Sequence, residues 1–477
     1  MKNLNSKILV SALIGITAIT ACKKNAQEDT PIEVPNTTET LSNSFFEKVI
    51  YRGAFGTTDW TSGWAKFDPK NEAYPATTET LSGNITASRT LDASKVYLLS
   101  GFVYVKTGVT LTIPAGTIIR GDKATKATLI ITKGAKLVAE GTISKPIVFT
   151  SNLPVGSRAA GDWGGIILLG KAQNNIPGGL GTIEGGVNVA SDPVGTGEYG
   201  GTIATDNSGI LKYVRIEFPG VAFQPNNEIN GLTLGSVGSG TMIDYVQVSF
   251  SGDDSFEWFG GTVNGKHLIA ISGTDDDFDF DNGFVGKMQF CVGQKDPKIA
   301  DQAGQSNGIE SDNSATVFVS SPRTQPLISN MTLVGPVANL AALATVDAKH
   351  ENGNLWRRGS KMILGNSIFI GFKFGIDIRD KQTGDALTDK SSLITNNFYQ
   401  SYVTGKDVIA SGAIIPGDAN SGPSFSDVAI LKTLLTTSGN EIMTEANSQM
   451  LLASPFNLTA PSFVLKAGSA AAAGAKF

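Results

Sequence analysis

Residues 253–261 read DDSFEWFGG, and residues 275–283 read DDDFDFDNG. The two stretches match nearly position for position at a spacing of 22 residues, and a shorter third copy, IESDN, occupies residues 309–313. Short apolar runs and Gly-rich turns that recur at such a spacing are typical of the coils of a solenoid. Equivalent residues of successive coils would stack about 4.8 Å apart. The repeat therefore predicts stacked strands that carry a row of carboxylates.

Strand-like patterns continue on both sides of this repeat. Residues 109–117 read VTLTIPAGT, in which apolar and polar residues alternate before a turn. A second motif occurs as LKYVRI at residues 211–216 and as IDYVQV at residues 243–248. The 477 residues include 55 glycines, and such a composition with many Val, Ile and Thr favours strands and tight turns. We predict an all-β fold, a right-handed parallel β-helix with long loop insertions.

The second motif sets a register for seven coils. We expect one corner of the solenoid to be filled by Tyr213, Tyr245, His267, Gln289, Asn330, Asn366 and Asn396. Residues one and three positions later are mostly apolar and should face the interior. This register makes His267 a member of a corner stack rather than a catalytic base, and it places Cys291 on an outward row. Asparagines at such a corner can link their amides from coil to coil.

The start of the chain has the features of a lipoprotein export signal. An apolar run at residues 8–19, too short to span a bilayer, follows two lysines and ends in Thr20-Ala21-Cys22. Small residues directly before a cysteine resemble the lipobox of bacterial lipoproteins, in which that cysteine is lipidated. We expect residues 1–21 to be removed and Cys22 to carry a covalent lipid. The alternative is an ordinary secretory signal with a chance cysteine.

The rest of the chain divides by its residue pattern. Residues 22–44 are polar without an apolar period, which predicts a flexible tether. Residues 45–90 are rich in aromatic side chains, and we expect them to pack on the solenoid as an N-terminal flap. Residues 91–400 hold the coils. Residues 401–477 include a capped amphipathic helix after Asp427 and form a small helical and irregular C-terminal cap.

Taken together, the chain resembles a family of Bacteroidetes outer-membrane β-helix lipoproteins. The resemblance rests on the lipobox and on further matching pieces, which are GAFG at residues 53–56, EGT at 140–142, PIVF at 146–149, the repeat at 253–283, WRRG at 356–359 and AGS at 467–469. It covers nearly the whole mature chain. The resemblance implies a parallel β-helix that is held in the outer membrane by its lipid and faces the cell surface. It implies no particular chemistry.

The acidic repeat is a candidate calcium site. Residues 251–313 contain 12 acidic residues and 4 lysines, a net charge of −8. Stacked carboxylates repel unless protons, hydrogen bonds or a hard cation such as Ca²⁺ neutralise them. The candidate ligands are Asp253, Asp254, Glu257, Asp275, Asp276, Asp277, Asp279, Asp281, Glu310 and Asp312, with Glu228 one coil earlier in the row. The alternative is a solvated acidic turn whose Asp side chains cap backbone N–H groups.

Two classes of function are compatible with these patterns. A cell-surface binding module fits an anchored solenoid, with a glycan or an outer-membrane barrel such as a TonB-dependent transporter as its partner. Trp258, Trp60 and Trp64 are candidate ligand-binding residues, because aromatic rings pack on sugars. The alternative is a Ca²⁺-dependent polysaccharide lyase or glycoside hydrolase, with Lys266 or Lys287 as its base. We favour binding, name no catalytic residue, and exclude nucleic acid on the net charge of −5.

Overall fold

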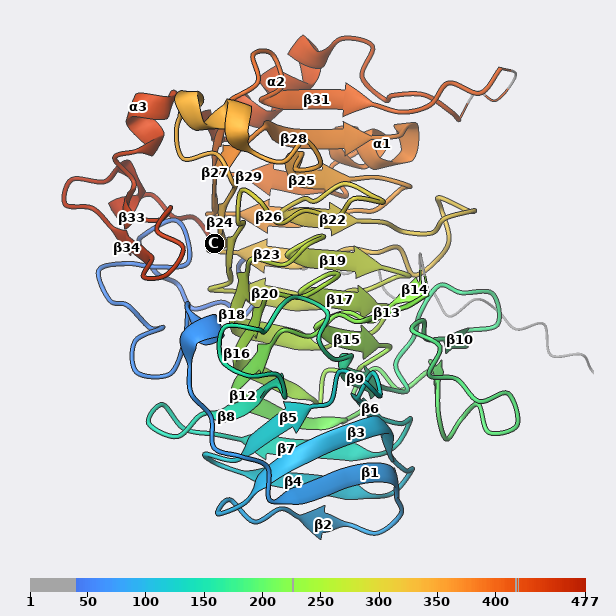
Figure 1. Ribbon diagram of the computed structural model, residues 1–477. Coiled ribbons are helices and arrows are strands. Elements are labelled where there is room, and N and C mark those ends of the chain that lie inside the picture. The colour runs from blue at the N-terminus through green and yellow to red at the C-terminus, as the bar shows by residue number, and fades with distance from the viewer. Residues whose placement is uncertain (1–39, 225–226, 417, 419) are drawn as a thin grey trace, which may run out of the picture. The chain divides into compact units, whose positions relative to one another are not determined.

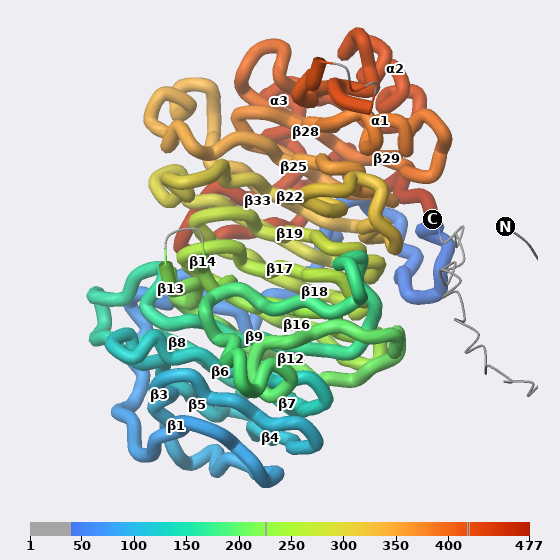
Figure 2. The backbone as a smooth tube through the Cα atoms, turned by 90° about the vertical axis from the view of Figure 1, so that its right-hand side faces the viewer, coloured from blue at the N-terminus to red at the C-terminus, as the bar shows by residue number. Residues whose placement is uncertain are grey.

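Three stacked ladders of parallel strands form the body of the molecule, as its computed structural model shows (Figure 1). The structure describes residues 40–224, 227–416, 418 and 420–477. The predicted lipidation site at Cys22 and the tether as far as residue 39 lie outside these residues. Each turn of the chain adds a strand to each ladder, and the coils stack from the N-terminal to the C-terminal end (Figure 2). The predicted right-handed parallel β-helix is confirmed.

Most strands belong to one of the three ladders, and the longest take part in two. The first ladder contains β3 (Val96–Val105), β5 (Ile118–Gly121), β8 (Ile147–Ser151), β12 (Gly209–Glu217), β16 (Met242–Ser249), β18 (Asn264–Ile271), β21 (Val292–Gln294), β24 (Thr332–Val334), β27 (Ile368–Phe372), β30 (Phe398–Ser401) and β32 (Glu441–Ile442). The second contains β1 (Glu79–Ile85), β3, β6 (Thr128–Ile131), β9 (Gly165–Leu169), β15 (Leu232–Gly235), β17 (Phe256–Phe259), β19 (Phe278–Asp281), β22 (Ile309–Ser311), β25 (Asn352–Trp356), β28 (Phe374–Arg379) and β31 (Val408–Ser411). The third contains β2 (Arg89–Thr90), β4 (Thr110–Pro114), β7 (Lys136–Glu140), β12, β16, β18, β20 (Lys287–Gln289), β23 (Leu327–Ser329), β26 (Ile363–Gly365) and β29 (Leu393–Thr395).

Smaller elements decorate the coils. Three antiparallel pairs join β10 (Gly181–Thr182) to β11 (Glu198–Tyr199), β13 (Ala222–Gln224) to β14 (Asn227–Glu228), and β33 (Leu452–Ser454) to β34 (Ser462–Leu465). The helices are η1 (Pro69–Asn71), η2 (Leu340–Thr345), α1 (Lys381–Thr388), α2 (Val428–Thr437), α3 (Glu445–Ser448) and η3 (Ala470–Ala472). The Asp427 carboxylate accepts a 2.8 Å hydrogen bond from the Ala429 N–H, which confirms the predicted cap of α2. Among the described residues, no helix is both long and apolar enough to cross a bilayer.

An aromatic corner stack marks the bend between the third and first ladders. Tyr213, Tyr245 and His267 all have positive φ, and their rings stack at centroid distances of 4.5 Å and then 4.1 Å. The next member is Phe290, 5.3 Å from His267, rather than the predicted Gln289. The prediction was wrong by one residue because this coil advances by 23 residues instead of 22. Cys291 is therefore buried in the interior and not on an outward row.

The stack continues as a chain of amides in the last coils. Asn396 donates from Nδ2 to Asn366 Oδ1 at 2.8 Å. Asn366 in turn donates to Ser329 Oγ at 3.1 Å, and Ser329 donates to Asn330 Oδ1 at 2.9 Å. The predicted asparagine ladder is confirmed, with one serine inserted as a relay. Because amides donate as well as accept, neighbours in this row attract each other.

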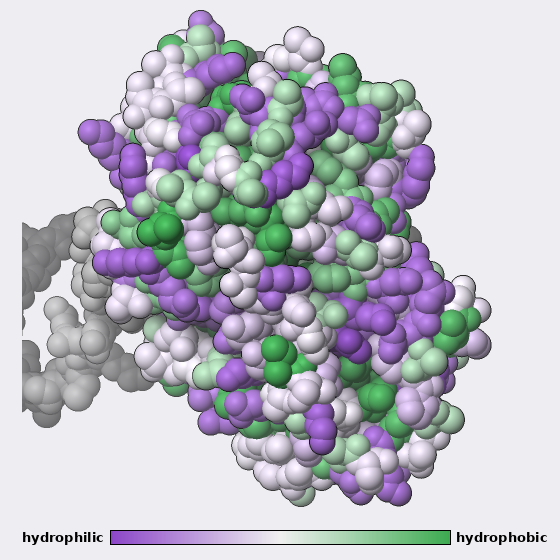
Figure 3. All heavy atoms as spheres, turned by 90° about the vertical axis from the view of Figure 1, so that its left-hand side faces the viewer, coloured by the Kyte–Doolittle hydropathy of each residue, from purple (hydrophilic) through white to green (hydrophobic). Residues whose placement is uncertain are grey.

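The hydrophobic core lies between the three ladders, and a second cluster lies outside the first ladder. The aromatic-rich flap and the C-terminal segment pack against this outer face, where Phe55, Trp64 and Phe463 meet Ile269 and Val292. Figure 3 shows the side of the molecule that carries the flap, with apolar side chains scattered among polar ones. The aromatic part of the predicted flap thus packs on the solenoid. The solenoid itself begins before residue 91, because β1 and β2, within the predicted flap, pair in the ladders. The side chains of the first ladder are consequently covered on this side, whereas part of the second ladder carries carboxylates.

Candidate metal and ligand-binding site

The acidic residues of the repeat form one row on the outer face of the second ladder. Residues Phe256 and Phe278 point into the core and stack at 5.4 Å, so the residue after each points outward. Glu257 pairs with Asp279 across β17 and β19, and Asp279 pairs with Glu310 across β19 and β22. The predicted row of Glu257, Asp279 and Glu310 is therefore confirmed. Thr233, not Glu228, precedes Glu257 in the row, because Glu228 belongs to the β13–β14 hairpin.

The turn before each of these strands contributes further carboxylates. Asp254 Oδ1 accepts a hydrogen bond from the Asp276 N–H at 2.8 Å, and Asp276 Oδ1 accepts one from the Asn307 N–H at 2.5 Å. Each of these side chains thus caps the backbone of the next coil, as the alternative sequence interpretation predicted. One oxygen of each carboxylate is used in this way. The other oxygen is left for a further partner.

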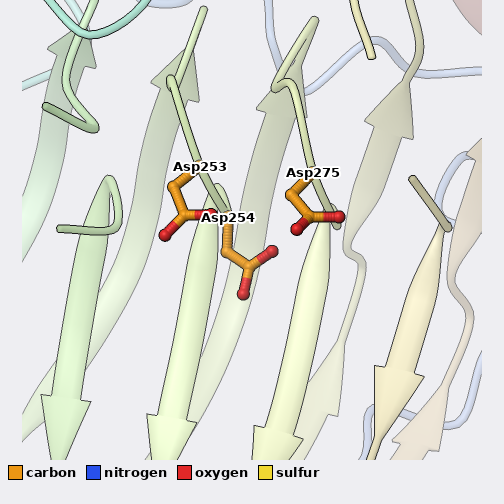
Figure 4. A group of neighbouring side chains, drawn as sticks. All are labelled: Asp253, Asp254 and Asp275. Carbon is orange, nitrogen blue, oxygen red and sulfur yellow. The ribbon is translucent and has the colours of Figure 1, made fainter. Parts of the chain in front are cut away.

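We call the acidic face the set Asp253, Asp254, Glu257, Asp275, Asp276, Asp279, Asp281, Glu310 and Asp312. Three overlapping groups within it bring carboxylate oxygens within 4.8 Å of one another: Asp253, Asp254 and Asp275; Asp254, Glu257 and Asp279; and Asp276, Asp279 and Glu310. Figure 4 shows the first group, in which the Asp253, Asp254 and Asp275 side chains from neighbouring coils converge. A pocket of about 310 Å³ opens at this face and is lined by carboxylates of all three groups, namely Asp254, Asp275, Asp276, Asp279 and Glu310, and by Arg357.

Burial and mutual repulsion both oppose ionisation of these carboxyl groups. The pKa values of Asp254, Glu257 and Asp279 are raised well above their usual values, first by burial and then by neighbouring carboxylates. Burial also raises the pKa of Asp281 to about 7 and that of Glu310 to about 8. A group of carboxylates in this condition binds protons or a cation more readily than exposed carboxylates do.

Arginine side chains from the next coil neutralise one end of the row. Arg357 pairs with Glu310 and, through Nε, with Asp312 Oδ1 at 2.7 Å, while Arg358 reaches Asp312 Oδ2 at 2.5 Å. Burial by itself would lower the pKa of Arg357. The attraction of Glu310 and Asp312 is stronger than this effect, so the pKa of Arg357 is raised. These arginines were missed as site residues, although Trp356 stacks in register with Ser311 and so places Arg357 beside Asp312.

At the other end of the row, loop residues surround Glu257 with an amide and a further carboxyl group. Asn230 donates to Glu257 and, at 2.9 Å, to Glu184 Oε1. Glu184 comes from the Gly-rich loop of residues 174–209, which has no repeat pattern, and no sequence signal marked it. Between the two ends, Asp275 Oδ1 and Asp279 Oδ1 are buried and have no hydrogen-bond partner in the described part of the chain. The middle of the acidic face is therefore the part that lacks compensation.

Asp277 does not belong to the outer row. Its side chain is fully buried and pairs with the equally buried Lys295, with Nζ 3.1 Å from Oδ1. Burial raises the pKa of Asp277 to about 6 against the attraction of Lys295. The predicted metal-ligating role of Asp277 is wrong, because its own lysine occupies the position that an ion would take. Lys295 was missed because it lies in a loop after β21, outside the aligned repeat.

The predicted ligand-binding tryptophans have different positions. Trp258 is 1% exposed and stacks on Phe280 at 4.8 Å inside the core. Trp64 is also 1% exposed and packs beneath the flap. Neither side chain presents a surface to a ligand, so these two predictions are wrong. Trp60 is only partly buried and lines a separate pocket outside the first ladder.

The lysines considered as catalytic bases do not face the acidic row. Lys266 lies on β18 in the third ladder and pairs with Glu47 at 2.8 Å. Lys287 lies on β20 in the same ladder. The acidic face belongs to the second ladder, so neither lysine is placed to act on a ligand bound there. The cationic group that does border the pocket is Arg357.

Known proteins give two weak structural similarities and one family match. A search of curated proteins gives no match. Two solved structures resemble the fold weakly. Pectin methylesterase PemA from Erwinia chrysanthemi has 10% identity and a TM-score of 0.31, covering 72% of this chain and 86% of its own. A pectin methylesterase in complex with a hexasaccharide has 10% identity and a TM-score of 0.27, covering 66% of this chain and 84% of its own. Similarities at this level do not bear on function.

The family comparison is more extensive. The model of the pectate-lyase like beta helix domain matches residues 83–434, which is well over half of the chain. The match spans all three ladders from the first coil to helix α2, and it includes the whole acidic face. The chain therefore belongs to the pectate-lyase-like β-helix domain family.

Proposed function

We propose that the protein is a calcium-dependent binding module for a carboxylated glycan. The observation that carries this proposal is the uncompensated middle of the acidic face, where Asp275 and Asp279 each keep a buried oxygen without a partner among the described residues. The group Asp254, Glu257 and Asp279 suits a hard cation, because its oxygens lie within 4.8 Å of one another. Ca²⁺ would relieve their repulsion and keep coordination positions open for oxygen atoms of a ligand.

The charge pattern along the second ladder supports an extended anionic ligand. Trp356 pairs with Ile378, so Arg357 and Arg379 follow at equivalent positions of successive coils, directly beyond the acidic face. A further pocket of about 350 Å³ is lined by Arg379 and Lys406 together with Glu351 and Asp377, and Arg379 pairs with Asp377 at 2.9 Å. A ligand that runs along the solenoid axis would therefore meet a cation-binding region first and a region of mixed charge, with two basic side chains, next. Carboxylates spaced along a sugar chain match both regions.

Binding is favoured over catalysis by the nature of the groups at the pocket. A lyase would need a base near the bound cation, and Arg357 is held in its charged form by Glu310 and Asp312. A Ca²⁺-dependent polysaccharide lyase or hydrolase remains the second candidate. The family match and the carboxyl groups with raised pKa support it, since such groups can act as general acids.

The decisive experiment offers the protein a panel of neutral and uronate-containing oligosaccharides, with Ca²⁺ and with chelator. We expect saturable binding of uronate-containing chains in the presence of Ca²⁺ only. Asp279→Asn should abolish this binding, whereas Asp92→Asn, in an exposed turn of the first coil, should leave it unchanged. Binding that is indifferent to Ca²⁺ would contradict the proposal. If new reducing ends or unsaturated products appeared, the function would be catalysis and not binding.

The cellular setting is part of the same proposal. The lipobox-like sequence ending at Cys22 supports a lipid anchor in the outer membrane, with the binding module displayed at the cell surface. The resemblance to Bacteroidetes lipoproteins supports a role as an accessory of an outer-membrane barrel such as a TonB-dependent transporter. Cys22→Ser should release the protein from the membrane fraction. A transporter role predicts that a barrel protein co-purifies with the wild-type chain in mild detergent.

A further inference from the structure

A second candidate binding site lies outside the first ladder, away from the acidic face. A pocket of about 480 Å³ opens where three distant parts of the chain meet, which are the flap, the corner stack and the C-terminal segment. Its volume falls within the range of about 300–1,000 Å³ that is usual for small-molecule sites. The proposed function does not involve this pocket.

The pocket has aromatic and apolar walls. Tyr51 and Trp60 come from the flap, and His267 and Phe290 come from the corner stack. The Trp60 ring meets the His267 ring edge-on at 5.1 Å, and Tyr51 lies 6.4 Å from Phe290. Ile50 lines the same pocket and is 74% exposed. These walls present apolar surface that a ligand would cover.

The imidazole of His267 is fixed in orientation and offers one free nitrogen. Its ring lies between Tyr245 at 4.1 Å and Phe290 at 5.3 Å, and its Nδ1 lies 2.8 Å from Asp244 Oδ1. A carboxylate only accepts hydrogen bonds, so Nδ1 carries a proton, and Nε2 is the ring nitrogen that is left for a ligand. In the described part of the chain, no group pairs with Nε2. A rigid ring with a free nitrogen is a ready hydrogen-bonding partner for a ligand.

Polar groups complete the lining. Thr57, Thr58, Glu47 and Lys466 also line the pocket. A ligand that fits must therefore present apolar C–H surface toward the aromatic walls and hydroxyl groups around its edge. A pyranose ring has this combination, and aromatic side chains with a few fixed polar groups are suited to recognise it.

We propose that this aromatic pocket binds a single pyranose ring, with one sugar hydroxyl hydrogen-bonded to His267 Nε2. The site is distinct from the acidic face in position and chemistry, because it requires no cation and no carboxylate on the ligand. A glycan reaching both sites would have to extend from the second ladder around to the flap. A single sugar can test the aromatic pocket alone.

The chain supplies its own internal control for an NMR test. It contains two histidines, and His350 is 1% exposed, with Nε2 3.0 Å from the Asp296 carbonyl oxygen. Glucose, galactose, N-acetylglucosamine and galacturonate would be titrated into the full chain while the ring signals of both histidines are followed. We expect at least one sugar to shift the His267 signal saturably at millimolar concentration. The His350 signal should not move.

Two variants test whether the shift reports this pocket. His267→Phe keeps the ring stack, as Phe290 does in the next coil, but removes the nitrogen, and calorimetry should show binding weakened by about tenfold. Ile50→Ala should also weaken binding, whereas Val319→Ala, a matched exposed side chain elsewhere, should not. The proposal is overturned if no sugar shifts His267, if both histidines shift together, or if binding survives both pocket variants unchanged.

Discussion

The corner stack and the acidic row are built from the same repeat and have opposite energetics. In both, equivalent residues of successive coils lie one strand spacing apart. In the corner stack, Tyr245 and His267 attract each other through ring stacking, and Asn366 and Asn396 through a hydrogen bond. In the acidic row, Glu257, Asp279 and Glu310 repel each other. In a solenoid, the interaction between equivalent residues of neighbouring coils, whether attractive or repulsive, is thus repeated along the whole row.

The difference teaches where to look for function. A row whose members attract each other stabilises the fold without any further partner. A row whose members repel must be compensated, and the compensation here is uneven. Arg357 pairs with Glu310 at one end, and Asn230 donates a hydrogen bond to Glu257 at the other. Asp279, between them, keeps a buried oxygen that no residue in the described ranges pairs with. The uncompensated position is where an external cation has the most to contribute.

The largest effect should come from removing the arginine that closes the row. Arg357→Ala leaves Glu310 and Asp312 without their main counter-charge, and we expect the free energy of unfolding to fall by about 2–4 kcal/mol. Chemical denaturation measures this loss. Arg89→Ala removes an exposed arginine in the first coil as a control and should change little. Equal, small losses for both variants would show that the row needs no compensation.

The corner stack should respond to loss of ring contact rather than to charge. Tyr245 stacks on both Tyr213 and His267, so Tyr245→Ala should lower the free energy of unfolding by about 2 kcal/mol. Tyr245→Phe keeps the rings and should cost much less. Thermal or urea unfolding of the two variants separates the contributions. If Tyr245→Phe were as destabilising as Tyr245→Ala, the contribution of Tyr245 would come from its hydroxyl group and not from ring stacking.

The acidic row should make the stability of the protein depend on pH. In the metal-free protein, folded-state pKa values of about 7 for Asp281 and about 8 for Glu310 exceed those of the unfolded chain, near 4. The folded state therefore binds more protons between these values, and stability should fall as pH rises from about 4 to 8. Saturating Ca²⁺ should reduce this slope. A metal-free protein that gains stability over the same pH interval would contradict the assigned pKa directions.

A smaller effect is expected from neutralising one member of the row. Asp279→Asn removes a charge that lies between Glu257 and Glu310, so the metal-free protein should become more stable by about 1 kcal/mol. Urea titration in the presence of chelator measures this gain. The matched change Asp92→Asn lies in an exposed turn and should have no such effect. Destabilisation by Asp279→Asn without metal would mean that its carboxylate already has a partner.

Much of the second ladder could be predicted because a strand alternates its side chains. The spacing of 22 residues fixed the pairing of Glu257 with Asp279, and the same alternation puts Trp258 inside the core. The alternation that directs Glu257 outward directs Trp258 inward, so the prediction that Trp258 binds a ligand conflicted with it. The register at Gln289 was wrong because one inserted residue moves the side chains of that coil to the opposite face of the strand. That shift is why Cys291 is interior.

The partners of the acidic row could not be predicted in the same way. Glu184 comes from a loop without periodicity, and Lys295 lies just beyond a strand, so no repeat relates either of them to the row. Loop geometry depends on tertiary packing, which a repeat does not encode. Arg357 was within reach of prediction, since it continues the strand that follows Glu310 in the ladder. Counting charges in the sequence gave the net charge of the repeat. It did not show which carboxylates are neutralised by side chains from elsewhere in the chain.

The measurement that tests the central claim most directly is the melting temperature of protein purified without added metal. We predict that chelator lowers the melting temperature, that Ca²⁺ restores it, and that changing Asp279 and Asp281 together to Asn abolishes the response. The exposed Asp92→Asn variant should respond as the wild type does. A wild-type melting curve that is the same with chelator and with Ca²⁺ would contradict the claim that the acidic face is a cation site.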